Sequence, residues 1–228
     1  MDLTSGGYWT ALGSIVLANI VLSGDNAVVI AMAARSLPAH QQRPAIFWGS
    51  GAAIVMRIML TVLAVEMLKW PYLKIVGAML LLYVGITLLC DSSGDEGRPD
   101  EAGSLAAAIR TILVADLVMS LDNVLAVAAA AKGNTPLLVI GLGVSIPLII
   151  FGSTLLLKVM DRFPVIVTFG AALLGYLAGE MLLTDPAVVG RFVEPSRTAV
   201  NLAGAIGAVF VVAVGLGQRR RVRSTTPA

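Results

Sequence analysis

The sequence predicts an all-α polytopic membrane protein, and the observations behind this prediction are its composition, its long apolar segments and an internal repetition. The 228 residues are 57% hydrophobic and only 13% charged, whereas a soluble domain carries roughly a quarter of its residues as charged ones. The mean hydropathy is +0.89. We therefore expect the chain to lie in the lipid bilayer, which is both its solvent and one of its partners.

Seven apolar segments predict seven transmembrane helices, because most of them reach the roughly 20 residues that cross a bilayer. They run over residues 9–33, 45–68, 72–90, 104–130, 136–158, 163–183 and 198–217. Prolines at or near the segment ends support these boundaries: Pro38, Pro44, Pro71, Pro136, Pro164, Pro186 and Pro195. Between the third and fourth segments, residues 91–103 form an acidic, polar linker that we expect on the cytoplasmic side.

The Lys and Arg residues predict the orientation of the chain. With the N-terminus outside, ten lie on the cytoplasmic side: Arg35, Arg43, Arg98, Arg110, Lys158, Arg162, Arg219, Arg220, Arg221 and Arg223. Five lie on the other side: Lys69, Lys74, Lys132, Arg191 and Arg197. The positive-inside rule therefore favours an N-out, C-in arrangement, with residues 218–228 as a basic cytoplasmic tail.

The linker separates two halves that resemble each other. Three motifs recur in the same order: residues 23–28 match 120–125, residues 49–51 match 141–143, and residues 77–83 match 170–176. Residues 1–90 and 104–183 are therefore predicted to be two three-helix repeats. Because three is an odd number, the second repeat enters the membrane inverted relative to the first, and the binding site is expected at the midplane between them. Residues 184–217 supply a loop and a seventh helix outside the repeat.

The strongest chemical signal is an Asp-Asn pair in each half. Asp25 and Asp122 lie well inside apolar segments, where an ionised carboxylate costs on the order of several kcal/mol unless it is paired or hydrated. Each pair lies among poor helix formers, so we expect local unwinding that frees backbone carbonyls as ligands. A purely structural alternative is that these polar residues only join helices.

Neighbouring polar residues extend each pair into a polar helix face. The first face consists of Asn19, Ser23 and Asn26, and the equivalent second face consists of Asp116, Ser120 and Asn123. Carboxylates, amide oxygens and hydroxyls without thiols or imidazoles suit Mg²⁺, Ca²⁺ or Mn²⁺. One cysteine and one histidine in the whole chain argue against zinc, copper and haem chemistry.

Arg57 lies in the middle of the second segment, the least tolerable depth for a cation. We expect it to pair with Asp116, Asp122 or Glu180. The pair is either a fixed internal ion pair or a device in which Arg57 occupies the site when the metal leaves. Glu180 follows a close-packing signal, Gly175-x-x-x-Gly179, and is either a gate or a hydrated carboxylate.

The duplicated motif, Asp25-Asn26 and Asp122-Asn123, together with seven predicted helices and an acidic central linker, resembles the TerC family of integral membrane proteins, in particular its YjbE-like branch. The resemblance covers essentially the whole chain. It implies export of manganese(II), as the transported substrate, across the bacterial inner membrane, with the motif residues as the metal site. It also implies a link to tellurite (tellurium) resistance, for which the residues offer no rationale. Asn19 stands where the second half has Asp116, which leaves open whether Asp116 binds metal or carries a proton.

The absence of several sequence motifs narrows the function further. The chain has no phosphate-binding Gly-rich loop with a Lys, no His-Glu-x-x-His and no Gly-x-Ser-x-Gly. We therefore expect a gradient-driven secondary transporter rather than an enzyme, without an organic cofactor and without a nucleic-acid partner. The near-neutral net charge of +2 by itself says nothing about such a partner. Two other classes stay open. One is an exporter of amino acids or other small solutes, in which Arg57 recognises a zwitterion, and the other is a non-transporting membrane assembly factor.

Overall fold

The computed structural model describes residues 24–67, 70–91, 104–130, 135–189, 191 and 195–225, together with residues 9, 12, 13, 16 and 17. For residues 61–67, 121–130, 135, 137, 138 and 220–225 it describes the backbone alone. Within these residues every regular element is a helix, which confirms the all-α prediction there. Four of the described helices, α4, α6, α7 and α9, are long and apolar enough to cross a membrane. The count of seven spans and the inversion of the repeats stay predictions.

The described helices follow the predicted segments closely. They are α2 (Gly24–Arg35), α3 (Ala39–Met67), α4 (Leu73–Asp91), α5 (Leu105–Ala130), α6 (Thr135–Arg162), α7 (Val165–Leu183), α8 (Pro186–Val189) and α9 (Arg197–Thr225). The short helix α8 was not predicted. Helix α9 continues through most of the basic segment that we had expected to be a tail.

Of the prolines used to place the segment boundaries, Pro44 lies within a helix. Pro44 lies inside α3, whose first residue is Ala39, so the helix begins before the start at residue 45 that we had predicted. The helix begins earlier because Pro38 and the polar residues after it form its first turn, in which the Gln41 N–H donates to the Pro38 carbonyl at 2.8 Å. An apolarity pattern does not detect this polar turn. So close to the helix start, the missing N–H of Pro44 removes little of the hydrogen-bond ladder.

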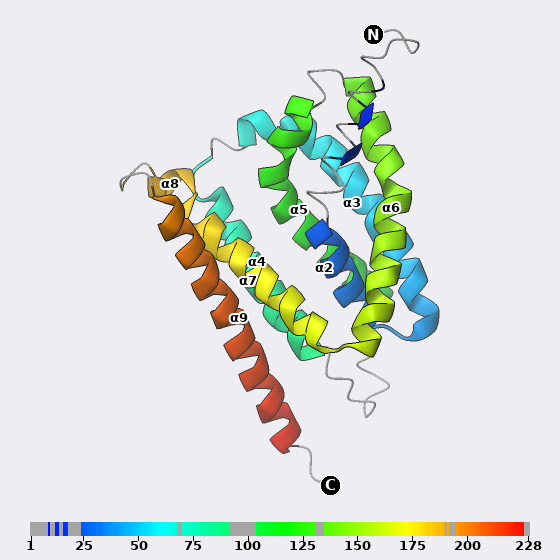
Figure 1. Cartoon of the computed structure of the whole chain (residues 1–228), viewed down its shortest axis with the longest axis vertical. Coiled ribbons are helices and arrows are strands. Elements are labelled where there is room, and N and C mark those ends of the chain that lie inside the picture. The colour runs from blue at the N-terminus through cyan, green and yellow to red at the C-terminus, as the bar shows by residue number, and fades with distance from the viewer. Residues whose placement is uncertain are drawn as a thin grey trace.

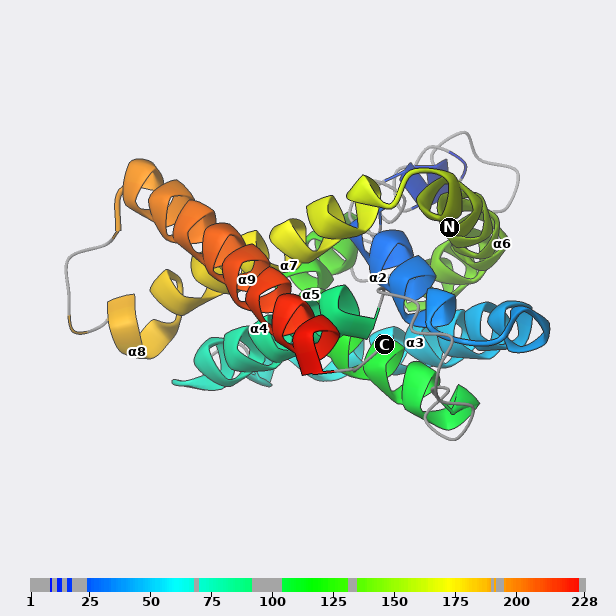
Figure 2. The same ribbon diagram turned by 90° about the horizontal axis from the view of Figure 1, so that it is seen from below.

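The long helices form two groups that lie side by side (Figures 1 and 2). In the first group α3 packs along α5 and α2 packs along α6, with further contacts among these four helices. In the second group α7 packs against both α4 and α9, and α4 also touches α9. Successive long helices alternate in direction, so that α2, α4, α6 and α9 run toward one end of the molecule (Figure 1).

Burial of polar side chains distinguishes the two groups. Among the described residues, the buried polar side chains within the long helices are Asn26, Ser50, Arg57, Asp116, Ser120, Ser145 and Ser153. All seven belong to α2, α3, α5 or α6, which we call the polar group. We call α4, α7 and α9 the apolar group, because the one further buried polar residue, Asp185, lies beyond the end of α7.

The apolar group is joined by backbone contacts at glycines. A Cβ at Gly175 would collide with the backbone of Gly207, and a Cβ at Gly179 would collide with the backbone of Ala203. Only glycine lets α7 and α9 approach this closely, which is a usual solution for helices packed in lipid. The interpretation of Gly175-x-x-x-Gly179 as a close-packing signal is therefore confirmed.

The boundary between the two groups also contains one glycine from each half of the chain. A Cβ at Gly77 of α4 would meet Val118 of α5. A Cβ at Gly170 of α7 would meet Val28 and Met32 of α2. These glycines open the matching motifs 77–83 and 170–176, and each receives side chains from the first helix of the other half.

Candidate ion-binding site

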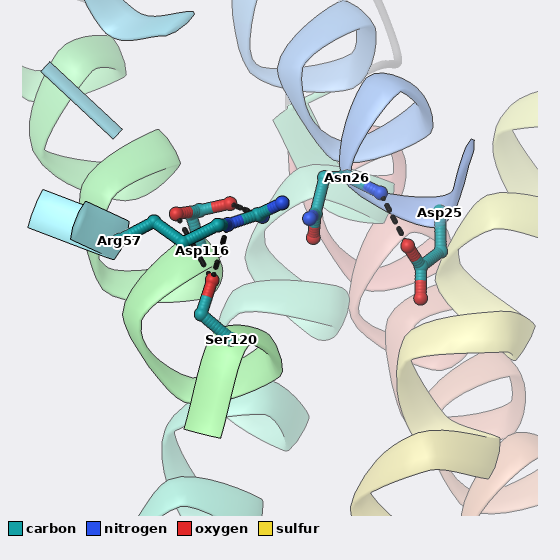
Figure 3. Close-up of polar contacts among 5 residues, drawn as sticks. All are labelled: Asp25, Asn26, Arg57, Asp116 and Ser120. Carbon is teal, nitrogen blue, oxygen red and sulfur yellow. Dashed lines mark hydrogen bonds and ion pairs between the residues drawn. The ribbon is translucent and has the colours of Figure 1, made fainter. Parts of the chain in front are cut away.

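A buried ion pair joins two helices of the polar group. Arg57 of α3 is 2% exposed and Asp116 of α5 is 4% exposed, and the Arg57 guanidinium donates to the Asp116 carboxylate. The Arg57 Nε–H also donates to the Ser120 Oγ at 2.9 Å, and the Ser120 hydroxyl donates to Asp116 Oδ2 at 3.2 Å. The three side chains form a closed network (Figure 3). Of the three acids predicted to pair with Arg57, the structure places Asp116 against it.

In the first Asp-Asn pair, on α2, Asn26 lies next to this network and Asp25 lies on the far side of Asn26 (Figure 3). Asp25 lies in the first turn of the described helix, and the Asn26 backbone N–H donates to its Oδ1 at 2.8 Å. The Asn26 side chain is buried, and neither its Oδ1 nor its Nδ2 has a hydrogen-bond partner among the described residues. Figure 3 shows Asn26 between Asp25 on one side and the Arg57–Asp116 pair on the other. An unpaired buried amide costs roughly 1–3 kcal/mol, so this position calls for a partner that the described side chains do not supply.

The second Asp-Asn pair lies within a continuous helix. Helix α5 runs from Leu105 to Ala130 without a break, so the prediction that residues 120–123 unwind is wrong. Differences in helix propensity are only about 0.7 kcal/mol or less per residue for non-Gly, non-Pro types, and tertiary contacts override them. Here the Ser120 hydroxyl, which was expected to weaken the helix, is engaged by Asp116 and Arg57.

Several predicted site residues have no side-chain geometry here. Asn19 and Ser23 lie outside the described residues, and for Asp122 and Asn123 only the helical backbone is described. Glu180 lies in the last turns of α7, in the apolar group, where its carbonyl accepts hydrogen bonds from the N–H and the hydroxyl of Thr184. The structure thus brings Asn26, Arg57, Asp116 and Ser120 together with Asp25 nearby, and leaves Glu180 in the other group.

The sequence analysis missed Asp185, which joins the ends of two helices in the apolar group. Its carboxylate accepts hydrogen bonds from the backbone N–H groups of Tyr72 at 2.9 Å, Lys74 at 3.0 Å and Ile75 at 3.2 Å, which lie at the start of α4. It also accepts one from Ala187 at 2.7 Å. Burial alone would raise the pKa of this carboxyl, but the four donors outweigh it and hold the pKa below its usual range. An Asp-Pro dipeptide before a short helix is a sequence signal for such a cap.

The described site has the chemistry of a hard-cation site that carries its own counter-charge. Asp25, Asn26, Asp116 and Ser120 offer carboxylate, amide and hydroxyl oxygens, which are the ligands that Mg²⁺, Ca²⁺ and Mn²⁺ prefer. Arg57 neutralises one of the two carboxylates. Within the described residues no three His, Cys, Asp or Glu side chains lie close enough to hold a metal ion by themselves. A complete cation site here would therefore require further oxygen donors. The second motif, Asp122-Asn123, follows Asp116 on the same helix and contains such donors.

Across the described residues, an all-helical fold with four helices apolar enough to span a membrane, and a buried charged network in one helix group, is typical of an integral membrane protein. Comparison with known proteins then identifies the family: the chain matches the integral membrane protein TerC family over residues 4–223 and belongs to it. It is 43% identical over 205 residues to the uncharacterized membrane protein YjbE of Bacillus subtilis, covering 90% of this chain and 93% of that relative.

More distant relatives have similar descriptions. The chain is 26% identical over 188 residues to the membrane protein YceF of Bacillus subtilis, covering 78% of this chain and 73% of the relative. It is also 26% identical over 140 residues to the inner membrane protein YgdQ of Escherichia coli, covering 54% of this chain and 59% of the relative. No solved structure matches the chain.

Proposed function

We propose that this chain is a secondary transporter that exports manganese(II) across the bacterial inner membrane. Asp25, Asn26 and Asp116 surround the ion, and Asp122 and Asn123 of the second motif complete its ligand shell. The observation that carries this proposal is the buried Arg57–Asp116 pair beside an Asn26 amide that has no described partner. A charged network buried at membrane depth is expensive, and a fixed structural role does not require an unpaired amide next to it.

The choice of cation rests on two arguments of different kind. Oxygen ligands without thiols or imidazoles support a hard divalent cation. They accept Mg²⁺, Ca²⁺ and Mn²⁺ alike, so the choice of manganese follows from the resemblance to the TerC family. The relatives named above are described only as membrane proteins.

The packing of the helices suggests which bodies move. We first expected one three-helix repeat to rock against the other. However, α3 of the first half packs along α5 of the second, and α6 of the second half packs along α2 of the first. Moving one repeat would separate both contacts, whereas moving the polar group against the apolar group preserves them. We therefore propose that alternating access occurs at the boundary that contains Gly77 and Gly170.

The exchange of partners between halves also supports the proposed inverted repeat. If α2, α3 and α4 correspond to α5, α6 and α7, the repeat symmetry relates the α3–α5 contact to the α6–α2 contact, so the two contacts are equivalent. Each half of the sequence also runs opposite to the other in Figure 1. We further propose that the end with Arg35 and Arg162 faces the cytoplasm, in agreement with the positive-inside rule.

The test is intracellular manganese, measured by elemental analysis in manganese-stressed cells that lack their own exporters. We expect low manganese with the native chain and high manganese with the Asp25→Asn and Asp122→Asn variants at equal membrane abundance. Asp91→Asn is the matched control, because Asp91 is an exposed carboxylate at the end of α4, in the apolar group. Export by both motif variants would show that the site is wrong, and no effect of the native chain would show that the function is wrong.

Arg57 supports a second candidate, an exporter of amino acids. A buried guanidinium beside carboxylates has the charges to recognise a zwitterion. Against it, the guanidinium is already engaged by Asp116 and Ser120. In transport assays with membrane vesicles, manganese uptake that amino acids inhibit and that Mg²⁺ and Ca²⁺ do not inhibit would favour this second candidate.

A further inference from the structure

Three buried polar side chains of the polar group have no hydrogen-bond partner among the described residues: Asn26 of α2, Ser50 of α3 and Ser153 of α6. Their residues are 3%, 1% and 0% exposed. Buried polar groups in native proteins are nearly always paired with protein or ordered water, and each unpaired one costs about 1–3 kcal/mol. Three of them in one helix group therefore call for partners that the described residues do not supply, and water or a ligand between the helices would meet this need.

Other hydroxyls of α6 show that a buried hydroxyl on a helix can find a hydrogen-bond partner within that helix. Ser145 of α6 donates to the Gly141 carbonyl at 2.9 Å, and Thr154 of α6 donates to the Ile150 carbonyl at 2.7 Å. Bonding to the carbonyl one turn earlier is the usual way in which a helical hydroxyl satisfies itself. Ser153 is the direct neighbour of Thr154, yet its hydroxyl does not make this bond.

The three side chains lie at a similar depth in the molecule. Arg35 and Asp161 form a hydrogen-bonded ion pair at 2.9 Å, which ties the C-terminal ends of α2 and α6 together. At the rise of an α-helix, Asn26 lies ~14 Å along α2 from Arg35, and Ser153 lies ~12 Å along α6 from Asp161. Helix α3 starts just after α2 ends, and Ser50 lies ~17 Å along it. These depths agree to about one helical turn of 5.4 Å, and α2, α3 and α6 all pack on one another.

We propose that Asn26, Ser50 and Ser153 line a hydrated path that crosses between α2, α3 and α6 at this depth and reaches the ion site at Asn26. Asn26 belongs to both the path and the site, because its amide also faces the Arg57–Asp116 pair (Figure 3). Neutral oxygens suit a path better than a storage site, since they hold a partly hydrated cation weakly enough for it to leave. That the path holds water follows from the buried polar side chains alone. That it carries a divalent cation rests on the proposed function.

Thiol labelling in membrane vesicles tests the path independently of transport. The variants are Ser50→Cys and Ser153→Cys, each in a Cys90→Ser background, and the reagent is a water-soluble methanethiosulfonate ethylammonium. Ala53→Cys is the matched control, because Ala53 lies one turn from Ser50 on α3 and is equally buried at 3% exposed. We expect both serine positions to react about tenfold or more faster than Ala53→Cys, because a thiol in apolar packing ionises poorly. We also expect added MnCl₂ to slow them.

The outcomes separate the two proposals. Labelling at both serine positions as slow as at Ala53→Cys would overturn the hydrated path. Fast labelling that MnCl₂ slows supports the path together with its cargo. If MnCl₂ leaves the fast labelling unchanged and the chain also fails to lower cellular manganese, the proposed manganese export is contradicted. The hydrated path is still supported.

Discussion

The polar and apolar groups bury different kinds of surface, although both are built from long apolar helices. The polar group contains a charged pair, an amide and several hydroxyls between its helices. The apolar group instead brings α7 and α9 together backbone to backbone at Gly175 and Gly179. Hydroxyl and ion-pair contacts can exchange their partners for water or a cation, whereas a glycine contact has no second arrangement at similar energy. From this difference we expect the apolar group to act as a scaffold and the polar group to perform the proposed transport.

The largest effect is expected from breaking the charged pair in the polar group. Arg57→Met leaves Asp116 buried without its counter-charge, and removing one partner of a buried ion pair costs about 3–5 kcal/mol. The free energy of unfolding, measured by denaturation of purified protein in detergent, should fall by this amount. The double variant Arg57→Met with Asp116→Leu should regain most of it and still fail to export manganese. Export by the double variant would mean that the pair is structural.

A smaller effect on folding is expected from the scaffold. Gly179→Leu forces the side chain into the backbone of Ala203, and overpacking of this kind costs roughly 1–3 kcal/mol. The matched control is Gly217→Leu, because a Cβ at Gly217 meets nothing within 4 Å. We expect a lower midpoint of unfolding for Gly179→Leu alone, with manganese binding, followed by electron paramagnetic resonance of Mn²⁺, unchanged in the folded fraction. Loss of Mn²⁺ binding without loss of stability would contradict a scaffold role.

The smallest effect is expected at Asp185, which closes the end of the scaffold. Asp185→Ala removes the acceptor of N–H groups at the start of α4, where Tyr72 has an unusual φ of 71°. Loss of a helix cap costs roughly 0.5–2 kcal/mol. Exposed Asp161→Ala should cost less, because surface ion pairs contribute roughly 0–1 kcal/mol.

The same carboxyl predicts a pH dependence. Because folding lowers the pKa of Asp185, its contribution is complete above the unfolded-state pKa of about 3.9 and is lost as the pH falls through the folded-state pKa. Stability curves measured from about pH 7 to about pH 3 should therefore begin to approach each other below about pH 4 for native protein and Asp185→Ala. A constant difference across this range would show that the Asp185 carboxylate charge is not responsible.

Much of the fold followed from the sequence, and the reasons for the exceptions are physical. Apolar segments located α4, α5 and α7 to within one or two residues, because in lipid the length of a span is set by the bilayer. The start of α3 was missed, since its first turn is polar. The predicted unwinding of α5 failed because propensity is a local quantity, and the Arg57–Asp116–Ser120 network is not local.

The site was predicted in its residues but not in its arrangement. The sequence proposed three acids as partners of Arg57, and the structure pairs it with Asp116 of α5 and leaves Glu180 in the apolar group, while the Asp122 side chain lies outside the described residues. The role of Asp185 depends on Tyr72, Lys74 and Ile75, which lie more than a hundred residues earlier in the chain. Ser50 and Ser153, whose hydroxyls have no partner among the described residues, carry no sequence signal, since Ser145 and Thr154 nearby bond to their own helix.

Two disulfide cross-links test most directly whether the polar group moves as one body against the apolar group. The first, Gly49→Cys with Ile112→Cys, joins α3 to α5 inside the polar group, where a Cβ at Gly49 lies 3.6 Å from the Ile112 Cβ. The second, Gly77→Cys with Val118→Cys, joins α4 to α5 across the boundary, where the corresponding distance is 3.7 Å. Both distances suit a disulfide, and both links join the two halves of the sequence.

The measurement is manganese transport in vesicles, before and after oxidation, with Cys90 replaced by Ser. The proposed movement predicts that oxidation leaves transport intact in the first variant and stops it in the second, with reduction restoring it. Loss of transport in both variants would contradict this movement and favour rocking of one repeat against the other.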